Sequence, residues 1–152
     1  MAANTSPIFS KAGLLGLTNL TGNIANTKSD GTGTIGTDIF LAFTADATNG
    51  SYVEKVRLTA VATAAATNTT QSIIRIFLST KSTGATTGGT DTFLFAEVPV
   101  AVTSADHSTN AAAFYEVQVG FIIPAGYTIL ASIHANVAAN TAWQVSTVAG
   151  QY

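Results

Sequence analysis

The sequence of 152 residues has no cysteine and few charged residues. Without cysteine there can be no disulfide bond and no thiolate metal ligand. Charged residues make up 9% of the chain, against about 25% in an average soluble domain. The net charge of −2 gives little electrostatic reach, and the six basic residues are scattered along the chain. We therefore expect neither nucleic acid nor an anionic membrane as a partner.

Signals for export and for membrane insertion are also missing. No apolar run approaches the roughly 18 residues that span a bilayer. The N-terminal residues MAANTSPIFSK lack the basic start and the apolar stretch of a signal peptide. The sequence thus predicts neither a membrane anchor nor a secretory leader.

Catalytic and cofactor motifs are scarce. The two histidines, His107 and His134, stand alone without HxH or HExxH spacing, so they predict no zinc site. No GxSxG motif occurs, and the glycines of GTGTIG at 31–36 lack the following lysine and helix of a phosphate loop. We expect no catalytic, cofactor-binding or metal-binding residues, and hence no enzyme.

Paired carboxylates could still perform acid–base chemistry if two of the eight acidic residues came together. Glu97 and Glu116 are the pair that neighbouring strands could bring close. Ion pairs of these residues with Arg57 or Arg75 are the more economical interpretation.

What the sequence does contain is strand periodicity, most clearly in Ser51–Thr80. Val56, Leu58 and Ala60 alternate with polar residues, which is typical of a strand with one buried face. Residues 73–78 are apolar on both faces, as in a strand that is covered on both sides. We predict two strands joined by a turn at residues 64–71.

Further alternating segments follow at the spacing of a sandwich or barrel. They cover residues 38–45, 93–98, 114–122, 127–135 and 142–149. In the last segment Trp143 alternates with Val145, which predicts a core position or a subunit contact rather than a platform for a sugar ring. The expected fold is all-β, an antiparallel β-sandwich of jelly-roll type over residues 37–152.

Residues 1–36 differ from the rest of the chain, because glycine and proline interrupt any regular alternation of apolar and polar residues. Large apolar side chains nevertheless occur throughout this segment. A disordered linker would not retain such side chains. We predict an extended N-terminal arm that docks on a neighbouring chain more than on its own sandwich. Its candidate contact residues are Ile8, Phe9, Leu14, Leu15 and Leu17.

Taken in order, several short segments resemble small structural proteins of tailed bacteriophages. The segments are PIFSK at 7–11, NTKSDGTGTIGT at 26–37, NGSYVEKVRL at 49–58, SIIRIFLS at 72–79, FAEV at 95–98, IPAGYTI at 123–129 and AWQVSTVAGQY at 142–152. Some members of that family resemble jelly-roll capsid decoration (cement) proteins. Threonine-rich insertions at 83–90 and 105–113 depart from the family pattern.

The resemblance implies a non-enzymatic virion protein, made in the host cytoplasm and located on the capsid surface. Its partners would be the major capsid protein and further copies of itself in a homotrimer, and its role would be to stabilise the head. A receptor- or glycan-binding module of a phage head or tail fibre is the alternative. That alternative would show polar and aromatic groups clustered at one loop end.

Overall fold

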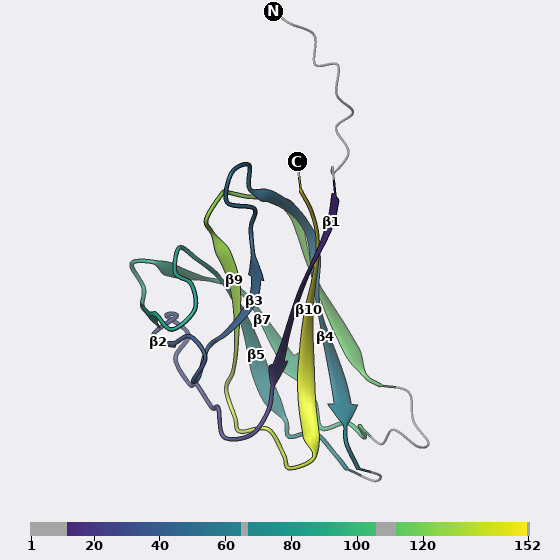
Figure 1. The fold of residues 1–152 in the computed structure, drawn as a ribbon. Coiled ribbons are helices and arrows are strands. Elements are labelled where there is room, and N and C mark those ends of the chain that lie inside the picture. Colours follow the sequence, from purple (N-terminus) through teal and green to yellow (C-terminus); the bar gives the residue numbers. More distant parts are fainter. Residues whose placement is uncertain (1–11, 65–66, 106–111, 152) are drawn as a thin grey trace, which may run out of the picture.

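The computed structural model describes residues 12–64, 67–105 and 112–151, and within these ranges every regular element is a β-strand (Figure 1). The strands are β1 (Ala12–Leu20), β2 (Gly33–Thr34), β3 (Phe40–Thr44), β4 (Ser51–Ala62), β5 (Ser72–Ser79), β6 (Thr86–Thr87), β7 (Thr92–Val100), β8 (Phe114–Ile123), β9 (Thr128–Ile133) and β10 (Thr141–Gln151). The described ranges hold no helix that is long and apolar enough to cross a membrane.

The strands form two four-stranded antiparallel sheets that face each other (Figure 1). The first sheet has the order β1-β10-β4-β8 and the second the order β3-β9-β5-β7. The short strands β2 and β6 pair beside the second sheet. The predicted all-β antiparallel sandwich is confirmed, while its jelly-roll topology stays a prediction.

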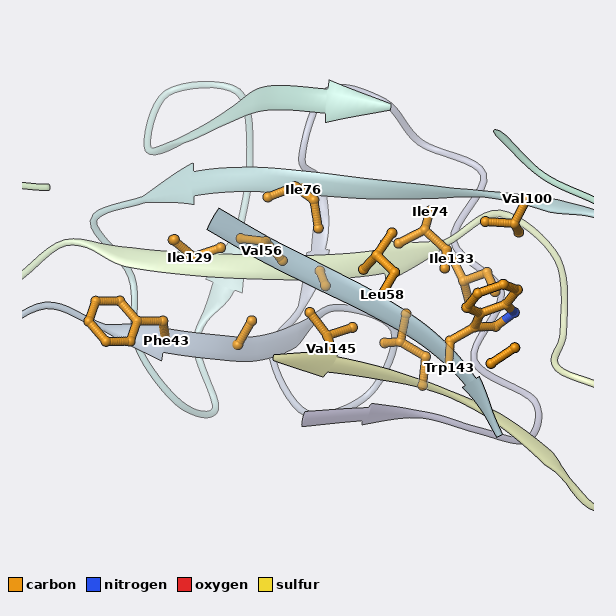
Figure 2. Packing of buried hydrophobic residues seen from close by; sticks show 14 of the residues in the cluster. Phe43, Val56, Leu58, Ile74, Ile76, Val100, Ile129, Ile133, Trp143 and Val145 are labelled. Carbon is orange, nitrogen blue, oxygen red and sulfur yellow. The ribbon is translucent and has the colours of Figure 1, made fainter. Parts of the chain in front are cut away.

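The core lies between the sheets and uses the inward faces that the alternation predicts. Val56, Leu58 and Ala60 of β4 are fully buried, as are Ile74 and Ile76 of β5 (Figure 2). Since the first three project from one sheet and the other two from the opposite sheet, their contacts hold the layers together.

Trp143 on β10 lies in this core with only 1% of its surface exposed. Its ring packs beside Tyr115 of β8, with centroids 5.9 Å apart and planes inclined by 51°. The sequence predicted either a core position or a subunit contact for Trp143, and the structure places it in the core of its own chain.

The hairpin predicted for residues 51–80 is wrong, because β4 and β5 belong to different sheets. β4 pairs with β10 and β8, whereas β5 pairs with β9 and β7. The segment between them has no Asn-Gly or similar pair to form a tight turn, and it crosses from one layer to the other. As a result the two apolar faces meet across the core instead of lying side by side.

The expected boundary at residue 36 also differs from the structure. Residues 12–20 form β1, which pairs along its whole length with β10. Residues 21–39 then cover the outer side of the second sheet, where Ile35 and Ile39 bury Phe77 and Leu130 in a small second core. β9 is therefore buried on both faces. The glycines that suggested an extended arm include Gly31 and Gly33, which the structure shows closely packed against neighbouring residues.

Candidate interaction surface

The face of the first sheet that points away from the core is its outer face, and it exposes large apolar side chains on both of its edge strands. Leu15 and Leu17 of β1 project from it with 71% and 74% of their surface exposed. Phe114 and Ile122 of β8 lie at the opposite edge, 54% and 51% exposed. Large apolar groups thus stand at both margins of a sheet whose inward face is fully packed.

Two basic residues of β4, Lys55 and Arg57, have side-chain partners on the neighbouring strand β8. Lys55 Nζ lies 3.0 Å from Glu116 Oε1. The Arg57 guanidinium lies 4.1 Å from the centroid of the Phe114 ring, which is cation–π geometry. One ion pair and one cation–π contact thus lie between the apolar side chains at the margins, a mixture that is typical of protein–protein contact surfaces.

A shallow hollow of about 310 Å³ opens on the same face between β1, β10 and β4. Its lining residues are Leu17, Thr18, Asn19, Thr59, Gln144, Val145 and Ser146. Their amide and hydroxyl groups could bind sugar hydroxyls, but the lining includes no aromatic ring.

A second apolar group lies where β7 and β8, the edge strands of the two sheets, approach each other. Phe95 and Phe121 meet edge to face with centroids 5.8 Å apart and planes inclined by 65°. Beside them Phe93 is 58% exposed, whereas Leu94, 41% exposed, pairs with Phe77 and lies on the outer side of the second sheet. Edge-to-face contact closes the core at this seam, while the flanking side chains stay available to a partner.

The predicted contact residues are divided by the structure. Leu15 and Leu17 are exposed on the outer face, whereas Leu14 points inward and packs against the core. Ile8 and Phe9 lie outside the described residues.

The sequence analysis did not single out Phe114 and Ile122. Both occupy the otherwise polar phase of the alternation over residues 114–122, and large apolar residues out of phase are the signal that could have found them.

Glu97 and Glu116, the two acidic residues considered as a catalytic pair, each form an ion pair. Glu97 Oε1 accepts a hydrogen bond of 2.7 Å from Nε of Arg75, whose side chain is almost completely buried. Arg75 Nη1 also donates to the Asn26 carbonyl oxygen at 3.1 Å, and Nη2 lies 3.4 Å from His134 Nδ1. The predicted ion pair of Glu97 is confirmed with Arg75. Glu116 pairs instead with Lys55, a partner that the sequence analysis did not propose.

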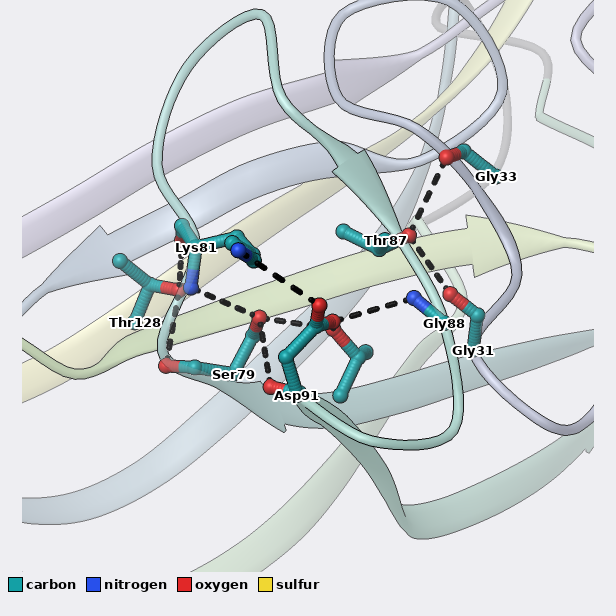
Figure 3. A network of polar contacts seen from close by, with 9 residues as sticks. Gly31, Gly33, Ser79, Lys81, Thr87, Gly88, Asp91 and Thr128 are labelled. Atoms are coloured by element: carbon teal, nitrogen blue, oxygen red, sulfur yellow. Dashed lines mark hydrogen bonds and ion pairs between the residues drawn. The ribbon is translucent and has the colours of Figure 1, made fainter.

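A polar network ties the segment from Thr80 to Asp91 to the second sheet (Figure 3). Asp91 accepts hydrogen bonds from the Gly88 backbone N–H at 3.0 Å and from the Thr92 hydroxyl at 2.9 Å. The Gly88 bond is the largest cause that lowers the pKa of the Asp91 carboxyl below its ordinary range. Burial opposes the change, and Thr92 and Lys81 add to it.

The same segment holds residues 31–34 in place. Thr87 Oγ1 donates to the Gly31 carbonyl oxygen at 2.6 Å (Figure 3), and β6 pairs with β2. The segment at 81–90 is thus anchored at Thr87, whose side chain is buried. These contacts position backbone and leave no converging reactive groups in this network.

In the ranges that the structure describes, no three His, Cys, Asp or Glu side chains converge as they would for a metal ion. Neither protein-family models nor curated protein sequences match this chain. Among solved structures, the chain is similar to one titled "Cyanophage Pam1 capsid asymmetric unit", with a TM-score of 0.45 and 14% sequence identity. The similarity covers 100% of this chain and 93% of that chain. These comparisons assign the chain to no family.

Proposed function

We propose that this chain is a non-enzymatic structural protein of a bacteriophage virion. It binds the major capsid protein on the outer surface of the head as a homotrimer and stabilises the head. The observation that carries the proposal is the outer face of the first sheet, with exposed Leu15, Leu17, Phe114 and Ile122 at its two margins. The family resemblance of the segments along the chain points to the same role.

Such a protein acts by binding alone. If it binds the intact shell more tightly than a loosened shell, it shifts that equilibrium by the difference in affinity. Each copy needs only modest contacts with the shell. Once one contact of an oligomer has formed, its other contacts form at high effective concentration, so many copies on a symmetric lattice stabilise the shell together. A rigid sandwich with apolar margins provides such contacts without any reactive group.

The geometry of the acidic residues supports a role without catalysis. A pair that performs acid–base hydrolysis has both carboxyl groups turned toward one substrate site. Here Glu97 is bound to Arg75 and Glu116 to Lys55. The two carboxylates are therefore held by different basic side chains on different sheets, and they do not face one substrate site.

The test is the heat resistance of particles with and without this protein. Particles stripped of the protein should release DNA at a lower temperature than decorated ones, as measured by the fluorescence of a DNA-binding dye. Leu17→Lys should decorate poorly and restore less resistance. Tyr127→Lys changes a partly exposed residue in the turn between β8 and β9, so it should behave like the wild type. Equal release temperatures for stripped and fully decorated particles would refute a stabilising role.

A receptor- or glycan-binding module of a head or tail fibre is the second candidate, favoured by the hollow beside Asn19 and Gln144. That function predicts binding to host-surface polysaccharide, lost in Asn19→Ala and Gln144→Ala. Both variants should leave heat resistance unchanged. Screening the protein against a glycan array separates the two candidates.

A further inference from the structure

We infer that copies of this chain join edge to edge, with β1 of one copy adding to β8 of the next. This joint would connect the first sheets of neighbouring copies into one continuous antiparallel sheet. The inference deepens the proposed function by naming the surfaces of the homo-oligomer, and it rests on that proposal only for the presence of an oligomer.

Strand direction permits this joint. β1 and β8 are the two edge strands of the first sheet, and every neighbouring pair in the order β1-β10-β4-β8 is antiparallel. β8 therefore runs opposite to β1. When a second copy is placed beside the first in the same orientation, its β1 lies antiparallel to the first copy's β8, and the alternation continues across the joint.

The edges of the second sheet are protected against such pairing, whereas β1 is not. β7 carries Pro99, which has no N–H to donate. β3 has only 5 residues. β1 presents 9 residues, AGLLGLTNL, without charge or proline. Exposed edges of that kind pair with other chains.

β8 is a complementary edge of similar length. It has 10 residues and no proline, and Glu116, its one acidic residue, is already paired with Lys55. Its pairing with β4 shifts register after Gln118, so the regular part of this edge is residues 114–118 with a second short run at 121–123. Leu15 and Leu17 on β1 and Phe114 and Ile122 on β8 all belong to the outer face. Across a joint they would lie on one surface of adjoining strands about 4.8 Å apart, where apolar side chains pack against each other.

The area of the joint is sufficient. Nine residues at about 3.4 Å each give an edge about 30 Å long, and two layers about 10 Å apart with their outer side chains give a width of about 20 Å. Each copy would bury roughly 600 Å², so the pair buries about 1,200 Å², the lower limit of specific interfaces. Phe93 and the Phe121 ring at the β7–β8 seam would be covered by the same contact.

Because the two edges differ, the joint is head-to-tail, and such contacts close into rings when the rotation between copies allows it. In a ring of three, every copy uses β1 once and β8 once. A two-fold contact of β1 with β1 of a second copy is the competing arrangement, and the experiment below distinguishes it.

The experiment is sedimentation velocity on Leu17→Lys, which blocks β1, and on Ile122→Lys, which blocks β8, with Tyr127→Lys as the matched control. The wild type and the control should be oligomers at micromolar concentration, and each edge variant alone should be monomeric. An equimolar mixture of the two edge variants should form dimers and nothing larger. The reason is that the intact β1 of one variant can pair with the intact β8 of the other, and each partner is then blocked at its remaining edge.

Circular dichroism and the fluorescence of Trp143, the single tryptophan, verify that each variant is folded. An Ile122→Lys variant that still self-associates, or a mixture that stays monomeric, overturns the inference. A wild type that is monomeric yet decorates particles overturns the joint and the homotrimer, and it leaves the proposed binding to the head standing. If the edge variants behave as expected but the wild type never binds particles, the joint stands and the proposed function is refuted.

Discussion

Replacement of Trp143 by alanine tests whether this residue acts through packing or through a ligand. The side chain is 1% exposed, and its cross-strand neighbours on the two flanking strands are Leu20 and Ala60. The small side chain of Ala60 leaves room that the indole ring fills, and Tyr115 packs on the ring. Alanine would leave a cavity that the neighbouring strands, fixed by their hydrogen bonds, can close only in part.

Truncation of a buried tryptophan to alanine costs about 3–5 kcal/mol. The total free energy of unfolding of a domain is about 5–15 kcal/mol, so Trp143→Ala should remove a large share of it. In a chain of this size, each kcal/mol lowers the melting temperature by about 2–4 °C, so the expected fall is roughly 6–20 °C.

Urea denaturation followed by far-ultraviolet circular dichroism measures the change without using the lost tryptophan signal. Gln144→Ala is the matched control, because Gln144 is the next residue on β10 and is exposed on the outer face. Its free energy of unfolding should stay within about 0.5 kcal/mol of the wild type. A loss below about 1 kcal/mol for Trp143→Ala at an unchanged denaturant slope would refute the packing argument. An unchanged melting temperature with lost sugar binding would favour the glycan-binding alternative.

Three further changes test other parts of the sandwich. Thr147 is fully buried, and its Oγ1 finds no hydrogen-bond partner among the described residues. Thr147→Val should therefore raise the free energy of unfolding, measured by urea denaturation, by about 1 kcal/mol. A lower free energy of unfolding would contradict the absence of a partner for this hydroxyl. A Cβ added at Gly16 would overlap the carbonyl oxygen of Ala42, so Gly16→Ala should cost about 1–3 kcal/mol, whereas Gly13→Ala, with open space around it, should not destabilise the fold. The pKa of Asp91 is lowered from 3.8 in the folded state, so its stabilising contribution is present above that value and is lost as the pH falls through the folded pKa. Melting temperatures measured from neutral to acid pH should therefore fall less steeply below pH 3.8 in Asp91→Asn than in the wild type, and parallel curves would contradict the assignment.

The sequence indicated which face of each strand is buried, but it did not indicate which strands pair with each other. Period-two alternation is a local property, so residues 51–62 and 142–149 disclosed which side chains point inward before any partner strand was known. Phe114 and Ile122 also carried a local signal, since both break the polar phase of their strand. The candidate contacts Leu15 and Leu17 could be identified as large apolar residues in a weakly periodic segment, but not as members of an edge strand.

The amino-acid sequence by itself determined an all-β chain, the inward faces of its long strands, a core position for Trp143 as one of two options, and a surface poor in charge. Only the tertiary structure decided that β4 and β5 lie in opposite sheets, that residues 12–20 complete the first sheet, and that Glu116 pairs with Lys55. The physical reason is range. Alternation depends on neighbours along the chain, whereas strand order and ion-pair partners depend on which distant segments meet when two apolar faces close on each other.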